Sequence, residues 1–164
     1  MHLSWPFACV VAAVAALSSP SFAAEKGFGT LASRAGNWSI YRSVNQMTDK
    51  IECVAVLKDD ADTQLYDTAL YIKVLGGIQS ITLRYGDQKV RPLRLPTSIE
   101  SKLSVVILQG EEFDTLAQTN LLRMVVYSDL SEVPTFALDL TGLPEAILGI
   151  ANGYPVAIQK GKKK

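Results

Sequence analysis

Acidic and basic side chains supply most of the candidate chemistry of this chain, because its 164 residues include one histidine and two cysteines. His2 and Cys9 both fall in the first 23 residues, which we expect to be removed as an export signal. The remaining chain then has no Ser-His-Asp or Cys-His pair and no histidine-ligated zinc site. Carboxylate acid–base pairs, Ser-Lys nucleophiles and oxygen-ligand metal sites are the chemistries left to consider.

Four cations stand close together in one predicted hairpin: Arg84, Lys89, Arg91 and Arg94. They are opposed in sequence only by Asp87, so they form a candidate surface for an anionic partner such as lipopolysaccharide phosphate, an anionic glycan or an acidic protein face. The commoner role of such a cluster is a solvated hairpin face. Equal numbers of basic and acidic residues, 16 of each, argue against nucleic-acid binding.

Two groups of acids are candidate cation ligands or acid–base pairs: Asp59, Asp60, Asp62 and Asp67 in the first, and Glu111, Glu112 and Asp114 in the second. The first group lacks calcium-loop spacing, since Leu65 and Tyr71 occupy the positions that need Gly and Glu. The second group suits the first turn of a helix. Ser101 and Lys102 are adjacent, and adjacent side chains on a strand point to opposite faces. We therefore predict no catalytic residue, no metal site and no cofactor.

Cys53 becomes an unpaired thiol once the export signal is removed. It lies in the run IECVAVL, where alternation places it on one face with Ile51, Ala55 and Leu57. Unpaired cysteine is often buried, so we favour a core position over a reactive or intermolecular thiol.

The first 23 residues have the outline of a signal peptide. An eleven-residue apolar run, FACVVAAVAAL, is followed by Ser21 and Ala23 at the −3 and −1 positions of a cleavage site after Ala23. Eleven residues are too few for a membrane span, which needs about 20. We therefore expect a periplasmic or secreted protein with no transmembrane span in its mature form.

The mature chain divides into a flexible lead-in over 24–37, a single β-rich domain over 38–158 and a basic tail over 159–164. Strand-like runs cover 38–44, 51–58, 65–75, 78–85, 89–95, 103–108, 122–128 and 136–140. Gly76-Gly77 and Gly86-Asp87 have the chemistry of tight turns, and Asp59–Asp62 reads as a polar loop. Helical spacing marks 111–122 and 141–153.

These patterns predict a mainly β fold: an antiparallel sandwich or meander with one or two short helices packed on it. Trp38, Cys53 and the apolar face of the last helix are expected in its core.

The order of these features resembles the invasion-associated locus B family of small exported proteobacterial proteins. The matching features are the signal peptide, GNW at 36–38, Cys53, the short strands and the run LDLTGLPEAI at 138–147. The resemblance implies a mainly β periplasmic or surface module without established enzymatic activity, linked in some relatives to host-cell interaction. Many relatives carry a second cysteine after the last helix, where this chain has Asn152-Gly153.

We therefore expect a non-enzymatic binding or accessory protein whose partner is an unknown protein or an anionic envelope component. Two alternatives remain at this point. One is a histidine-free, carboxylate-dependent enzyme that cleaves glycans, which needs two carboxylates across a cleft. The other is an inhibitor of an envelope or host enzyme.

Overall fold

The computed structural model describes residues 27–129 and 134–153. The predicted signal peptide (1–23) and basic tail (159–164) lie outside these residues. The elements in chain order are β1 (Thr30–Ala35), β2 (Trp38–Val44), β3 (Ile51–Leu57), β4 (Asp60–Tyr66), β5 (Ala69–Lys73), β6 (Ile78–Tyr85), α1 (Ser98–Leu103), β7 (Val105–Gln109), α2 (Glu111–Leu116), β8 (Leu121–Ser128), β9 (Thr135–Asp139) and α3 (Leu143–Ala151).

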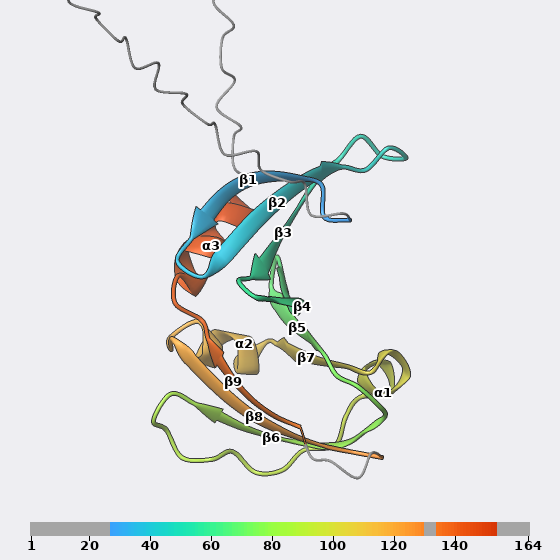
Figure 1. Ribbon diagram of the computed structural model, residues 1–164, viewed down its shortest axis with the longest axis vertical. Helices are drawn as coiled ribbons and strands as arrows, with labels where there is room; N and C mark the ends of the chain where they lie inside the picture. The colour runs from blue at the N-terminus through green and yellow to red at the C-terminus, as the bar shows by residue number, and fades with distance from the viewer. Residues whose placement is uncertain (1–26, 130–133, 154–164) are drawn as a thin grey trace, which may run out of the picture.

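The strands form two antiparallel sheets, which confirms the mainly β fold. The larger sheet has the order β1-β2-β3-β4-β5-β7, and the smaller has the order β6-β8-β9. Helix α3 packs against β1, β2 and β3, whereas α1 and α2 lie beside β7 (Figure 1). The described residues contain three short helices where the sequence predicted one or two.

Side chains from both sheets share one hydrophobic core. Trp38 and Leu65 from the larger sheet are buried in it together with Leu83 and Met124 from the smaller sheet. Trp38 is 1% exposed, as the sequence predicted, and its indole Nε1 donates to the carbonyl oxygen of Leu140 at 3.4 Å. The apolar face of α3 joins the same core through Ala146 and Ile150, which confirms that prediction as well.

The flexible lead-in predicted over 24–37 is wrong for residues 30–35, which form β1. The sequence TLASRA shows no alternation of apolar and polar residues, so nothing local marks it as a strand. It pairs in antiparallel fashion with β2, from Thr30 opposite Arg42 to Ala35 opposite Trp38. Pairing with a neighbouring strand therefore determines its conformation.

Several predicted element bounds also differ from the structure. The run 89–95 is not a regular strand: it returns beside β6 and forms a single bridge, between Ile81 and Arg94. Pro92 explains part of this, because proline has no N–H to donate to a ladder. Residues 60–62, predicted as a loop, belong to β4. The predicted strand over 65–75 is two elements, the last residues of β4 and then β5. The helix predicted over 111–122 ends at Leu116.

Two glycines allow the β1–β2 turn to cross the start of α3 at very short range. A Cβ atom on Gly36 would lie 2.3 Å from the carbonyl oxygen of Thr141, and a Cβ on Gly142 would lie 2.3 Å from that of Ala35. The amide of Asn37 donates to the carbonyl oxygen of Thr141 at 2.8 Å. The crossing thus joins residues 36–38 to residues 139–142, two motifs about a hundred positions apart in the sequence.

Candidate functional site

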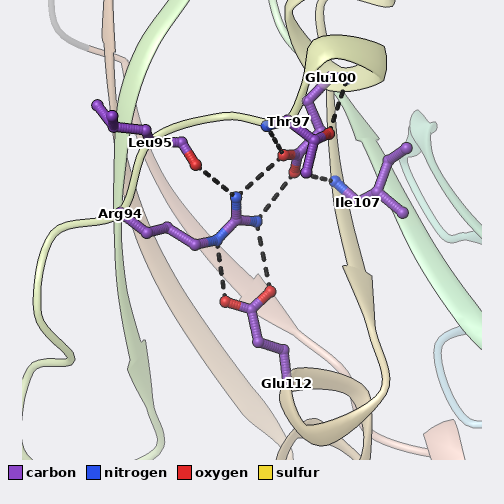
Figure 2. Close-up of polar contacts among 6 residues, drawn as sticks. All are labelled: Arg94, Leu95, Thr97, Glu100, Ile107 and Glu112. Carbon is purple, nitrogen blue, oxygen red and sulfur yellow. Dashed lines mark hydrogen bonds and ion pairs between the residues drawn. The ribbon is translucent and has the colours of Figure 1, made fainter.

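The guanidinium of Arg94 lies between two glutamates, one on α1 and one on α2. Its Nη2 atom is 2.9 Å from Oε1 of Glu100, and its Nε atom is 2.9 Å from Oε1 of Glu112. Further bonds run from Nη1 to Glu100 Oε2 at 3.0 Å and from Nη2 to Glu112 Oε2 at 3.3 Å. Each carboxylate therefore receives two hydrogen bonds from one guanidinium (Figure 2).

Glu100 is the most deeply buried charged group of the described residues, with 1% of its surface exposed. Its carboxylate also accepts from the backbone amides of Thr97 at 2.7 Å and Ile107 at 2.8 Å. The Thr97 hydroxyl accepts in return from the Glu100 amide, which completes a capping box at the start of α1. Glu100 thereby fastens α1 to β7 and to the segment that carries Arg94.

The pKa values of the three side chains follow from burial and from these bonds. Burial alone would raise the pKa of Glu100, but the hydrogen bonds from Arg94, Ile107 and Thr97 bring it below its ordinary value. Burial raises the pKa of Glu112 above its ordinary value despite its contact with Arg94. Burial would lower the pKa of Arg94, yet its two carboxylate partners raise it.

This cluster, which we call the Arg94 node (Arg94, Glu100 and Glu112), is suited to holding elements together. All the guanidinium nitrogens of Arg94 are bonded within the protein, the second bond of Nη1 going to the carbonyl oxygen of Leu95. Arg94 therefore does not belong to the four-cation surface that the sequence predicted. Both carboxylates are bonded to the same guanidinium, whereas the two carboxylates of a glycosidase flank the bond that is cleaved.

Arg84 lies on the outer face of the smaller sheet, directly opposite a second arginine that the sequence analysis missed. Arg84 on β6 is the register partner of Arg123 on β8. Arg84 Nε donates to the carbonyl oxygen of Gln88 at 3.1 Å, and Arg123 Nη1 donates to that of Gly86 at 3.0 Å. Within residues 27–129 and 134–153, neither guanidinium forms an ion pair with a carboxylate.

The other two predicted cations lie between these two sites. Lys89 and Arg91 are both exposed in the segment after the Gly86 turn. The guanidinium carbon of Arg91 is 5.8 Å from the ring centre of Tyr85, within cation–π range. Arg91 also borders a hollow of about 230 Å³ together with Glu111 and Glu112. The four predicted cations thus do not form one patch.

Tyr85 contributes a buried phenol beneath Arg91. Its side chain is 1% exposed, and its hydroxyl has no hydrogen-bond partner among the described residues. Burial raises the pKa of Tyr85 to about 12, with a further increase from Glu112. This hydroxyl is inaccessible to solvent, so it adds no binding group to the hollow.

The remaining candidates from the sequence have local structural roles. Asp60 accepts from the Asp62 amide at 3.1 Å and from the Thr63 hydroxyl at 2.6 Å, at the start of β4. Ser101 and Lys102 lie on α1 and are both exposed, which is not the buried setting that a Ser-Lys nucleophile needs. Across the part of the chain that the structure describes, no three metal-ligating side chains gather.

Cys53 lies at the edge of the core, half-buried on β3. It borders a shallow hollow of about 540 Å³ together with Phe28 and Ile150. The predicted face is correct, since Ala55 and Leu57 on the same side are buried, but burial decreases toward Ile51, which is 49% exposed. Cys53 therefore lies on the apolar face of β3, at the point where burial begins to decrease.

The thiol of Cys53 is expected to react slowly at neutral pH. Burial raises its pKa above the ordinary value, with a smaller opposing effect from Arg42, so the reactive thiolate is scarce at neutral pH and increases as the pH rises. Labelling with iodoacetamide at neutral pH should be at least about tenfold slower in the folded protein than in urea. Equal rates in the two states would contradict this assignment.

The fold and these clusters define a small, mainly antiparallel β domain built from two sheets on a shared core. Its structure is similar to the crystal structure of invasion associated protein B from Bartonella henselae, with a TM-score of 0.49 and 12% sequence identity. The match covers 75% of this chain and 96% of that one. These values describe a resemblance of fold, not membership of a sequence family.

By sequence, no family model matches the chain, and no curated protein is significantly similar to it. Among the described residues, no helix has the length and apolar character needed to cross a bilayer.

Proposed function

We propose that this protein is an exported, non-enzymatic binding module that contacts an anionic envelope component through the Arg84/Arg123 pair. The pair is defined by these two side chains on the outer face of the smaller sheet. Lys89 adds an exposed cation beyond the Gly86 turn to these two half-buried arginines. Phosphate and sulfate groups suit such a site, because guanidinium groups form paired, charge-assisted hydrogen bonds with their oxygens.

One observation carries the proposal: two arginines occupy register positions directly opposite each other, and neither forms an ion pair with a carboxylate of the described residues. Like charges in this arrangement destabilise a sheet. Their bonds inside the protein go to backbone carbonyl oxygens, which leave the positive charges uncompensated. An anionic ligand would supply the missing negative charge and gain from both guanidinium groups at once.

The glycan-cleaving alternative has less support. Its best carboxylates, Glu100 and Glu112, both bind Arg94, and the other acids of α2 lie in its first turn, where the helix dipole favours them. No feature of the described residues favours an enzyme inhibitor over a general binding module. The experiment below therefore concerns anion binding.

Retention on immobilised heparin at neutral pH tests the proposal with a defined polyanion. The double variant Arg84→Ser/Arg123→Ser is expected to bind about tenfold more weakly than wild type at low ionic strength, and the difference should shrink as salt is added. Lys50→Ser/Lys58→Ser is the control, because it removes two exposed cations that flank β3 of the larger sheet. If both double variants lose the same affinity, binding follows net charge and the proposed site is wrong.

A further inference from the structure

Four large aliphatic side chains are exposed around α1, and we call them the α1 surface: Leu75, Leu95, Ile99 and Leu103. Their exposed fractions are 79%, 74%, 58% and 57%. Ile99 and Leu103 are four residues apart on α1 and so share one helix face. Leu95 precedes the helix, and the amide of Val74, next to Leu75, donates to the carbonyl oxygen of Ser104 at 2.9 Å. The four residues therefore flank and cover a single short helix.

The Arg94 node holds this helix with its apolar side chains outward. Glu100 projects from the inner side of α1 into the protein, where it is bonded to Arg94 and to the amide of Ile107. Ile99 and Leu103 consequently cannot turn into the core without breaking a buried ion pair. Helix α1 stands at the edge of the molecule, far from α3 (Figure 1).

The exposed charged side chains closest in sequence to the α1 surface are cations. Between residues 88 and 110 the only acid is Glu100, which is buried in the Arg94 node. The exposed charged side chains of that stretch are Lys89, Arg91 and Lys102. Lys73, two positions before Leu75, is exposed as well. Lys102 on α1 and Lys73 at the end of β5 are therefore the cations beside the apolar side chains, whereas the bond from the Arg91 amide to Leu83 places Arg91 and Lys89 along β6, toward the Gly86 turn. Acids outside residues 88–110 also approach this region, since Glu112 bonds Arg94 and Asp129 lies beside Gly77.

From this arrangement we infer that the α1 surface docks on an anionic phospholipid bilayer. Aliphatic side chains accompanied by lysine and arginine are typical of segments that lie in the lipid headgroup region, where the cations reach phosphate while the apolar groups enter the acyl boundary. The exposed cations beside the apolar side chains, Lys73 and Lys102, are both lysines, and lysine is depleted from protein–protein interfaces. Lysine near an anionic membrane surface is attracted to the lipid headgroups, so this composition favours a lipid surface over a protein partner.

Vesicle co-sedimentation of the mature chain, without the predicted signal peptide, tests this inference. The probe is a vesicle made of phosphatidylcholine and phosphatidylglycerol in equal parts, compared with pure phosphatidylcholine. Leu95→Ser/Leu103→Ser should weaken binding to the anionic vesicles at least about tenfold, because two apolar side chains no longer enter the bilayer. Wild type should bind pure phosphatidylcholine at least about tenfold more weakly than the anionic vesicles.

The matched control is Met47→Ser/Leu148→Ser, which removes two exposed apolar side chains outside the α1 surface and should leave binding within about twofold. Thermal unfolding shows whether each variant keeps its fold. Unchanged binding by the Leu95/Leu103 variant would assign vesicle binding to other cations, including the C-terminal lysines, and would overturn the inference. Absence of vesicle binding by wild type would overturn it too, and would point to a protein partner.

The lipid-docking inference and the proposed anion binding are tested by different variants, so either can be wrong without the other. Heparin offers no apolar phase, so its binding depends on the Arg84/Arg123 pair without any contribution from the leucines. The leucine variant keeps both arginines, and it should therefore bind heparin like wild type.

Discussion

Replacing Gly142 by alanine is expected to lower the free energy of unfolding by roughly 3 to 5 kcal/mol, among the largest effects of single substitutions. The added Cβ would lie 2.3 Å from the carbonyl oxygen of Ala35 and 2.7 Å from Cα of Gly36. Both are main-chain atoms, so a side-chain rotation cannot relieve the collision. Urea titration followed by Trp38 fluorescence measures the effect, since this indole is buried beside the crossing.

The control for this prediction is Gly153→Ala. Gly153 also has a positive φ, +62°, but no atom of the described residues lies within 4 Å of the added Cβ. Gly153→Ala should lower the free energy of unfolding by only about 1 kcal/mol, the penalty for a residue with a side chain in the left-handed conformation. Gly36→Ala should behave like Gly142→Ala, because its Cβ would meet the Thr141 carbonyl oxygen. Equal losses for Gly142→Ala and Gly153→Ala would mean that conformation alone, and not the crossing, determines the cost.

Sequence patterns predicted the strands that cover the core from one side. In β6, β8 and β9, alternate side chains are buried in the shared core, so the period of two is visible in the sequence. Trp38, which begins β2, was also predicted to lie in the core and does so. These elements have a local signal that agrees with their final environment.

Two elements, β1 and α1, were not predicted from the sequence, and for different reasons. Strand β1 has no alternation and is held by its pairing with β2. Helix α1 did have a local signal, the capping box from Thr97 to Glu100, which a search for Thr-x-x-Glu would have found. The alternation in 89–95 instead suggested a strand, which Pro92 disfavours because proline has no N–H to donate to a ladder.

The candidate site could be predicted only as a list of charges. Arg94 is six residues from Glu100 and eighteen from Glu112, and it meets both only because α1 and α2 lie beside β7. Arg84 meets Arg123 through strand register across 39 positions, which no local pattern contains. The sequence thus predicted a group of cations, while the topology decided which of them bind a carboxylate within the protein.

The Arg94 node links stability to the proposed lipid contact. It connects the segment before α1, the helix itself, and α2. If the node is broken, α1 loses its anchor, and the apolar side chains of the α1 surface lose their fixed outward position. A variant of the node should therefore bind anionic vesicles more weakly although it changes no residue of the α1 surface.

Arg94→Met is expected to lower the free energy of unfolding by about 3 kcal/mol, because Glu100 is left as a buried charge without its counterion. This value is at the lower end of the loss expected when one partner of a buried ion pair is removed, because 26% of the Arg94 side chain is exposed. Arg84→Met is the matched control and should change the free energy by less than about 0.5 kcal/mol, because Arg84 has no carboxylate partner among the described residues. A loss below about 1 kcal/mol for Arg94→Met would contradict a structural role for the node.

The pH dependence of stability gives the node a second test. The pKa of Glu100 is lower in the folded protein than its ordinary value of 4.5, so its stabilising contribution is complete above about pH 4.5 and is lost as the pH falls through the folded-state pKa. Glu112 acts in the opposite direction, because its raised pKa favours the folded state as it becomes protonated. Urea titrations from neutral pH to pH 3 should therefore show a steeper loss of stability in wild type than in Glu100→Gln, which keeps Glu112. Parallel curves would mean that the Glu100 carboxylate contributes no more to the folded state when ionised than when protonated.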